Sequence, residues 1–182
     1  MPRVSEEVRA VAEEAIRTLY GVTSSSCARD MGSIVTLTAV VEALIDNTLD
    51  ELVAASPVQD SALGRAMVGK TTKLFRSTWE DRNYWLKNGF EIALAGSRPG
   101  QDFRVLVELR NALAHGAGSL TERQCTNLKA FVELRKNLMR VLDVDVQGRA
   151  IILGDASVSR ATEVAVLYIL AFERHNRVRY GS

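Results

Sequence analysis

The amino-acid sequence predicts a mostly helical protein of the all-α class. Apolar residues recur at helical spacing along nearly the whole chain, few segments alternate as β-strands do, and only three of the 182 residues are proline. Because 47% of the residues are hydrophobic and 25% are charged, the chain can bury one substantial core. We therefore expect one domain over residues 1–182.

The two N-terminal helices are predicted from their apolar spacing and from the residues that stop them. A first helix is expected over about 4–20, ended by Gly21, and the polar residues 23–33 form the clearest loop. A second helix covers 34–55 and is ended by Pro57. It should lie at the centre of the fold, because its apolar residues share one face: Ile34, Leu37, Val41, Leu44, Ile45 and Leu52.

Helical patterns continue through the middle of the chain. A third helix is expected over about 59–75. Ser77 and Glu80 have the spacing of a capping box, which predicts another helix over 79–95. The segment SRPG at 97–100 is then expected to break the chain.

The next two helices are predicted on either side of a glycine. One begins at about residue 101 and stops at Gly116, where a glycine commonly follows the last helical residue. The helix after it runs to about residue 142, and the sequence predicts two alternative capping boxes for its start. These are Ser119 with Glu122 and Thr121 with Gln124. The residues that this helix should turn inward are Leu128, Phe131, Val132, Leu138 and Val141.

The C-terminal segment combines a hairpin pattern with an apolar helix. Residues 144–153 alternate weakly around a Gln-Gly pair, which predicts a short β-hairpin. The last helix begins at Ser157 or Ser159 and ends near His175, and its middle is apolar almost all round, so it should be buried on most sides. Its apolar run at 164–172 is too short to cross a bilayer.

Charge and cysteine content set the expected cellular context. A formal net charge of +1 gives no overall attraction to nucleic acid or membrane, so an anionic ligand has to meet a local patch. Cys27 and Cys125 lack the spacing of a disulfide framework or a thiolate zinc site, which favours a reducing compartment. With no signal-peptide apolar core at the N-terminus, we expect a cytoplasmic protein with no metal and no membrane partner.

Residues 64–71, GRAMVGKT, match the phosphate-loop pattern G-x-x-x-x-G-K-[ST]. That loop needs a buried strand before it and a helix after it, so that backbone N–H groups converge on the phosphates. The preceding residues, SPVQDSAL, contain no apolar strand, and a mostly helical chain offers no parallel sheet. We interpret the match as a chance occurrence in a helix.

Arg110 lies on the apolar face of the helix that begins near residue 101. On a helical wheel it falls between Leu106 and Phe103, where a core residue is expected. An unpaired buried guanidinium is costly, so Arg110 has to meet a carboxylate, a wet cleft or an interface that binds an anion. A structural ion pair with Glu42 or Asp46 is one of these alternatives.

Asn111 and His115 are four residues apart and lie along one edge of the same helical face, with Arg104 and Glu108 beside His115. The helix therefore offers a cation, an amide and an imidazole around one rim. His115 is expected in the last turn, where the helix dipole favours a positive charge. The alternative role for this histidine is simply that of a charge at a helix end.

Residues 108–124, ELRNALAHGAGSLTERQ, resemble the HEPN family (higher-eukaryote and prokaryote nucleotide-binding domains). Its ribonuclease members carry Arg, a polar residue, three further residues and His at the end of a helix, and Arg110, Asn111 and His115 match that pattern. The glycine and polar loop that follow resemble the RiboL-PSP type. Residues 40–53, VVEALIDNTLDELV, resemble the early family helix that brings an acidic residue near the motif, and Glu42 matches better than Asp46.

The resemblance covers about 33–142 and implies an antiparallel helical bundle there. Residues 1–32 would add an N-terminal helix and loop, and residues 143–182 a C-terminal extension. The family also implies a metal-independent endoribonuclease without a cofactor, acting as a homodimer and serving as a toxin or antiviral defence effector. A cognate antitoxin or another defence-system subunit would then be a partner. A catalytically silent module for dimerisation or nucleotide sensing is the alternative.

The three motif residues suit cleavage of RNA by its own 2′-hydroxyl. This reaction needs proton transfer at the attacking and leaving oxygens and stabilisation of negative charge in the transition state. Arg110 suits the charge, His115 the proton transfer, and Asn111 the orientation of the phosphate or the imidazole. Because one motif supplies one histidine, a two-fold dimer with facing motifs is the economical assembly.

Further RNA contacts are predicted from basic residues with aromatic residues among them. The cations are Lys70, Lys73, Arg76, Arg82 and Lys87, the aromatics are Trp79, Tyr84 and Trp85, and Arg104 lies nearer the motif. Such a set suits a single strand through charge and stacking, or forms a solvated helix face with its aromatics in the core. The basic segment 173–180, with His175, is a second RNA contact or a charged helix end.

Overall fold

The computed structural model describes residues 2–24, 30–71 and 77–180, and most of this part of the chain is helical, with loops and one small sheet. The all-α class is therefore confirmed, as is the hairpin expected at 144–153. The elements in chain order are α1 Pro2–Ser24, α2 Met31–Ala54, the 3₁₀ helix η1 Pro57–Asp60, α3 Ala62–Thr71, α4 Trp79–Phe90, α5 Arg98–His115, α6 Glu122–Cys125, α7 Leu128–Leu142, β1 Val144–Gln147, β2 Ala150–Leu153 and α8 Ser157–Tyr180.

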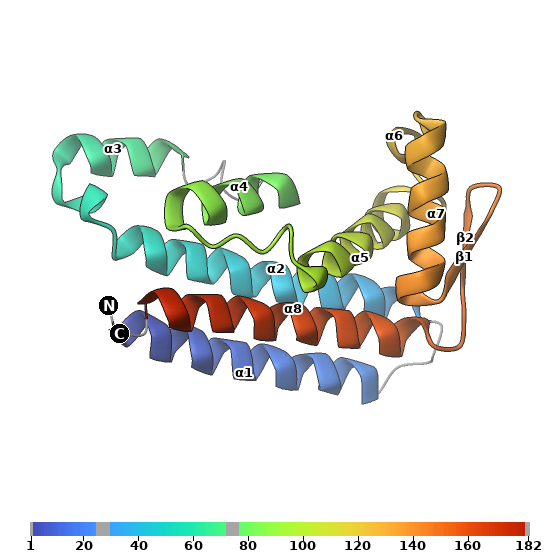
Figure 1. Ribbon diagram of the computed structural model, residues 1–182, viewed down its shortest axis with the longest axis horizontal. Coiled ribbons are helices and arrows are strands. Elements are labelled where there is room, and N and C mark those ends of the chain that lie inside the picture. Colours follow the sequence, from blue (N-terminus) through green and yellow to red (C-terminus); the bar gives the residue numbers. More distant parts are fainter. Residues whose placement is uncertain (1, 25–29, 72–76, 181–182) are drawn as a thin grey trace.

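Three long helices, α1, α2 and α8, lie side by side and form the body of the molecule (Figure 1). α5 packs on α2 and α8, and α7 packs on α5 at the end of the molecule that carries the β1–β2 hairpin. The two strands are antiparallel, with Val144 paired to Leu153 and Gln147 to Ala150. This arrangement places the C-terminal half of α5 between α2 on one side and α6 and α7 on the other.

The buried faces of α2 and α8 form the centre of the core. All six apolar residues predicted to share one face of α2 are buried, so the central position of this helix is confirmed. α8 begins at Ser157 and continues past His175 to Tyr180. Over residues 157–176 it is buried on most sides, as expected, although Leu167 and Leu170 on its outer face are about half exposed.

An aromatic cluster joins the helices that surround the candidate site. Trp79 of α4 and Tyr168 of α8 both contact Phe103 of α5, with ring centroids 4.8 Å and 4.4 Å from that of Phe103. All three side chains are buried, and such pairs stabilise a fold by about 0.5–1.5 kcal/mol beyond the area they bury. The cluster fixes α5 against its neighbours, and Trp79 takes the second of its two predicted places, that of an aromatic residue in the core.

Both ends of α4 differ from their predictions. Thr78 and Asp81 form its capping box, one position later than the predicted pair of Ser77 and Glu80. The helix ends before residue 95, because Glu91 adopts the left-handed conformation with φ 59°. The N–H of Glu91 then donates to carbonyls of the last helical turn, which closes the helix.

Glycine and proline patterns also misplace the end of α1 and the start of α5. α1 continues through Gly21 to Ser24, since a glycine inside a helix costs only about 1 kcal/mol and α1 packs on both α2 and α8. The segment SRPG begins α5 and does not break the chain. Ser97 is the N-cap and accepts the N–H of Gly100, while Pro99 lies in the first turn, where its missing N–H is not needed.

The single helix predicted up to residue 142 is divided into α6 and α7. The capping box of Thr121 and Gln124 begins α6, and Asn127 caps α7. Leu128 and Val132 are 75% and 41% exposed, so the prediction that they face inward is wrong. The other predicted core residues of this segment are buried or partly buried: Leu138, Phe131 and Val141.

Within the described part of the chain, α2 alone is long and apolar enough to cross a membrane by length and composition. Half of its most apolar window is buried, and the helix packs against α1, α5 and α8. α2 therefore has the surroundings of a core helix.

Candidate functional site

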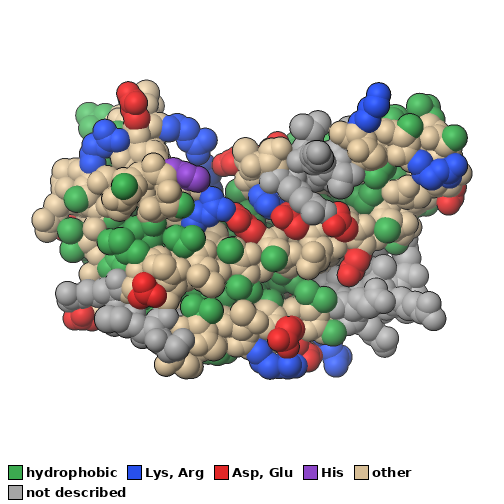
Figure 2. Space-filling view, turned by 180° about the vertical axis from the view of Figure 1, so that it is seen from behind, with side chains coloured by type: hydrophobic (Ala, Val, Ile, Leu, Met, Phe, Trp, Pro, Cys, Tyr) green, Lys and Arg blue, Asp and Glu red, His purple; other side chains and the backbone are tan. Residues whose placement is uncertain are grey.

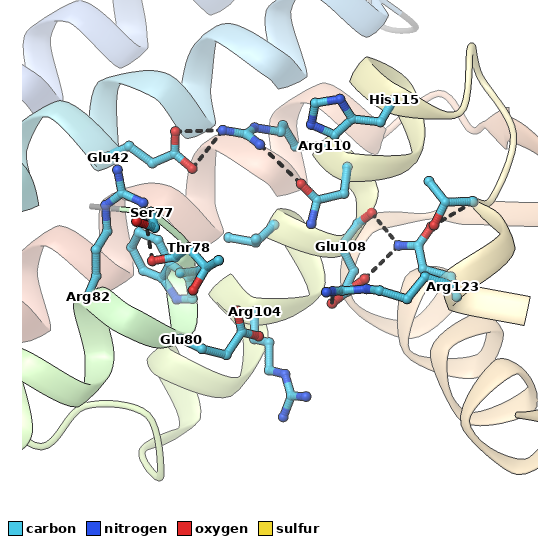
Figure 3. Close-up of a pocket in the computed structure, with 15 residues that line it drawn as sticks. Glu42, Ser77, Thr78, Glu80, Arg82, Arg104, Glu108, Arg110, His115 and Arg123 are labelled. Carbon is cyan, nitrogen blue, oxygen red and sulfur yellow. Dashed lines mark hydrogen bonds and ion pairs between the residues drawn. The ribbon is translucent and has the colours of Figure 1, made fainter. Parts of the chain in front are cut away.

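The C-terminal half of α5 lines a cavity of about 410 Å³, which is also lined by residues of α2, α4 and α6 (Figure 3). On the face shown in Figure 2, basic and acidic side chains gather near a histidine beside a hollow in the surface. The charged residues of the cavity are Glu42, Glu80, Arg82, Arg104, Glu108, Arg110, His115 and Arg123. Two of the four arginines, Arg104 and Arg123, are exposed at the cavity, where an anionic ligand can reach them.

Arg110 is held between α2 and its own helix. Its Nη2 donates to both carboxylate oxygens of Glu42, at 2.8 and 2.7 Å, and its Nη1 donates to Oδ1 of Asn111 at 3.1 Å. The side chains of Arg110 and Glu42 are 24% and 16% exposed, so the pair sits at the cavity wall and not deep in the core. No described residue accepts a hydrogen bond from Nε of Arg110, which leaves this donor for a ligand.

Asp46, the second predicted partner of Arg110, lies one turn further along α2 and has a different partner. Its two oxygens accept hydrogen bonds from Nε and Nη2 of Arg82, both at 2.8 Å. Burial lowers the pKa of Arg82, but the hydrogen bond and charge of Asp46, with the charge of Glu42, outweigh it and raise this pKa overall. Arg82 is buried in this pair, so it does not belong to an exposed basic face, although its side chain lines the cavity.

His115 is the last residue of α5 and is exposed at the cavity. In the part of the chain that the structure describes, it has no hydrogen-bond or ion-pair partner, so the imidazole is available to a ligand. The helix ends there because Gly116 allows a close turn: a Cβ on Gly116 would lie 1.8 Å from the carbonyl oxygen of Ser119. Gly116 has φ −102°, so the glycine is required for this close approach and not for a left-handed conformation.

Gln124 fixes the wall of the cavity opposite α2, a role that was not predicted from the sequence. Its Nε2 donates to the backbone carbonyl of Glu108 at 2.9 Å and to Oε2 of Glu108 at 2.6 Å. Its Oε1 accepts from the N–H and hydroxyl of Thr121. The capping-box spacing identifies the bond to Thr121, but the long-range bond to α5 leaves no local pattern.

The predicted RNA-contacting cations are not all in one place. Arg104 lies on α5, is exposed, lines the cavity and has no ion-pair partner among the described residues. Lys70 is exposed on α3 and is not a lining residue of this cavity. Lys73 and Arg76 lie outside the described residues. His175 is exposed on α8, where its Nδ1 lies 2.8 Å from the carbonyl oxygen of Ala171, and it does not line the cavity either.

The segment GRAMVGKT at 64–71 is helical, as expected, because it forms most of α3. The described sheet consists of two antiparallel strands that follow this segment by more than seventy residues. Among the residues described before α3, there is therefore no strand from which a phosphate loop is built.

The chemistry available at the cavity is that of fixed cations and an accessible imidazole. Within residues 2–24, 30–71 and 77–180, no group of three or more His, Cys, Asp or Glu side chains is placed to hold a metal ion. No protein-family model, curated protein or solved structure gives a match to this chain. The interpretation of the site therefore depends on its geometry and on the residues themselves.

Proposed function

We propose that this protein is a metal-independent endoribonuclease of the HEPN type. The observation that carries the proposal is that Arg110, Asn111 and His115 line one cavity, with Arg110 held by Glu42 and His115 free of partners among the described residues. A phosphodiester placed against Nε of Arg110 would receive a charge-assisted hydrogen bond. Arg104 adds a second cation at the same cavity.

The reaction assigned to this site is transesterification within RNA. The 2′-oxygen attacks the neighbouring phosphorus and loses its proton, while the bond from phosphorus to the 5′-oxygen breaks and that oxygen gains a proton. Arg110 stabilises the negative charge that develops on the phosphoryl oxygens, and His115 transfers one of the two protons. Asn111, through its hydrogen bond to Nη1, holds the guanidinium in position.

We further propose that the active assembly is a homodimer in which the C-terminal ends of the two α5 helices face each other. The reaction uses two proton transfers, whereas His115 is the one histidine that lines the cavity in each chain. A second His115 from a partner copy supplies the other group under two-fold symmetry. Light scattering should show a dimer at micromolar concentration, and a monomer with full cleavage activity would contradict the arrangement.

The test of the proposed reaction is incubation of purified protein with mixed RNA in the presence of EDTA. We expect cleavage that is indifferent to EDTA and products that end in a 2′,3′-cyclic phosphate. RNA that stays intact across lengths and sequences would favour the alternative, a catalytically silent module for dimerisation or nucleotide sensing. The engagement of Arg110 by Glu42 is the observation that favours this alternative, since it also suits a purely structural ion pair.

The biological setting proposed for this activity is that of a cytoplasmic toxin or antiviral defence effector. An endoribonuclease of this kind requires control by a cognate antitoxin or another defence-system subunit. Induced expression should therefore arrest growth of the host cell, and co-expression of the adjacent gene should relieve the arrest if it encodes the antitoxin.

A further inference from the structure

A second cavity, of about 690 Å³, lies between α5 and α7. Figure 1 shows that these two helices are inclined to each other at the end of the molecule that carries the hairpin. The residues that α5 contributes follow one helical face, at positions 101, 104, 105 and 108, and α7 contributes positions 130, 133, 134, 137 and 140. We call this cavity the α5–α7 groove.

The groove adjoins the candidate site. Four residues line both cavities: Arg104, Glu108, Arg123 and Gln124. The hydrogen bonds between Gln124 and Glu108 fix the boundary, and the Arg123 side chain is 76% exposed beside it. A ligand that reaches Arg110 can therefore continue past Arg104 and Arg123 into the groove.

The chemistry of the groove fits a nucleotide. Val105 and Leu134, buried and half-buried, provide an apolar surface against which a base can lie. Arg140 adds a third cation to those of Arg104 and Arg123. Its Nη2 donates to Oδ1 of Asn137 at 2.9 Å, which orients the guanidinium on the groove wall.

We propose that the α5–α7 groove binds the nucleotide next to the cleaved phosphodiester, so that the substrate is a single RNA strand that spans both cavities. Arg104, Arg123 and Arg140 contact its phosphates, and the apolar surface receives its base. A single strand suits this geometry because its bases are unstacked and free to turn toward protein. The assignment rests on the proposed function, since it takes the position of the cleaved bond from Arg110 and His115.

The test compares two arginines of α7 that differ in their relation to the groove. Arg140 lines it, whereas Arg135 does not. The two side chains are 51% and 53% exposed and each lies near one aspartate, Asp102 and Asp145 respectively, so they form a matched pair. Both substitutions to alanine are made in a His115→Ala background, in which bound RNA stays intact.

Binding is measured by fluorescence anisotropy with a single-stranded RNA of about eight nucleotides, a length in the range that such sites cover. Arg140→Ala should weaken binding on the order of fivefold and reduce the slope of log affinity against log salt by about one. Arg135→Ala should leave both quantities unchanged, and a polyglutamate peptide of equal length should not displace the RNA. Equal behaviour of the two variants, or displacement by the peptide, overturns the proposal.

A second variant, which adds positive charge to the groove, keeps the test valid if Arg140→Ala fails to fold. Its expected effect is a gain in RNA binding, which loss of folding would not produce. Glu133 is exposed and lines the groove, and Glu163 is exposed on α8 and lines neither cavity. Glu133→Lys should therefore tighten RNA binding and steepen its salt dependence, whereas Glu163→Lys, with the same change in net charge, should not. Equal effects of the two lysines also overturn the proposal.

The two proposals fail in different ways. If RNA stays intact with the wild-type protein while Arg140→Ala and Glu133→Lys still alter RNA binding as expected, the ribonuclease proposal is wrong and the groove is a surface that binds RNA without a cleaved bond beside it. If the wild-type protein cleaves RNA while these variants match their controls, the groove is wrong and the ribonuclease stands.

Discussion

Two arginine–carboxylate pairs lie one helical turn apart along α2, and their surroundings differ. Arg82 and Asp46 have side chains that are 9% and 18% exposed, and Arg82 donates from Nε and Nη2, one donor to each oxygen of Asp46. Arg110 is 24% exposed and uses Nη2 alone for both oxygens of Glu42, which leaves its Nε free of described partners. Both arginines line the cavity that His115 lines, but the Arg82 side chain is nearly buried and its Nε is taken by Asp46, whereas Arg110 is more exposed and keeps its Nε free of described partners.

The comparison shows that an ion pair by itself does not identify a functional arginine. A buried pair contributes little beyond an apolar replacement of similar volume, yet loss of one partner leaves an uncompensated charge in the interior. A pair at a cavity wall holds its arginine in place and keeps donors for a ligand. We therefore expect burial and the number of free donors to separate a structural arginine from one that binds a ligand.

The largest effect on stability is expected for Arg82→Ala. Asp46, whose side chain is 18% exposed in the pair, would lose the partner of both its oxygens, so the free energy of unfolding should fall by about 3–5 kcal/mol. Urea denaturation measures this loss. Arg17→Ala is the control, because Arg17 and Glu14 form an exposed pair at 71% and 67% and such pairs contribute less than about 1 kcal/mol. A loss in Arg82→Ala no larger than that of the control would show that the pair is not structural.

Arg110→Ala should have a smaller effect on stability and a large one on cleavage. The free energy of unfolding should fall by about 1–3 kcal/mol, because Glu42 loses its partner at a site that is partly open to solvent. RNA cleavage should fall by about 100-fold or more, since the donor to the transition state is removed.

A double-mutant cycle sharpens this comparison. Arg110 and Glu42 should show a coupling energy of about 0.5–3 kcal/mol in unfolding, as expected for residues in contact. Arg82 with Glu42 should couple less strongly than Arg82 with Asp46, because Asp46 makes the hydrogen bonds to Arg82 and Glu42 acts on it through charge alone. Additive effects of Arg110→Ala and Glu42→Ala would contradict the contact.

The smallest effect on stability is expected for a third pair, Arg123 and Glu108. These groups are 3.9 Å apart and Arg123 is 76% exposed, while Glu108 keeps its hydrogen bond to Gln124. Arg123→Ala should change the free energy of unfolding by less than about 0.5 kcal/mol in urea denaturation. A loss comparable to that of Arg110→Ala would mean that the exposed fraction of an ion pair does not predict its contribution to the free energy of unfolding.

The sequence predicts the helices of the core better than their ends. The apolar face of α2 is correct because a buried helical stripe repeats at a fixed spacing, which is a local property of the chain. The helix boundaries that were predicted wrongly depend on packing between helices and on capping side chains, which helical spacing does not show. Gly21 stays helical because α1 packs on two helices, and Ser97 makes SRPG a helix start where glycine and proline alone indicate a break.

In the candidate site, too, local features are predicted from the sequence and long-range contacts are not. The wheel places Arg110, Asn111 and His115 on one rim, and the structure brings all three to one cavity. Helical spacing alone leaves Glu42 and Asp46 equally able to reach Arg110, since both project from one side of α2, and only the family resemblance favours Glu42. The choice of Glu42 follows from Arg82, which comes from α4 and takes Asp46, and a contact between residues 36 positions apart has no local pattern.

The most direct test of the account is RNA cleavage in EDTA by His115→Ala beside the matched variant His175→Ala. His115 is exposed, lines the cavity and has no partner in the described part of the chain, whereas His175 is exposed on α8 away from the cavity. We expect His115→Ala to reduce cleavage by about 100-fold or more with its melting temperature nearly unchanged, and His175→Ala to cleave as the wild type does. Cleavage by His115→Ala at the wild-type rate, or unfolding of this variant, would contradict the assignment of His115 as a catalytic residue.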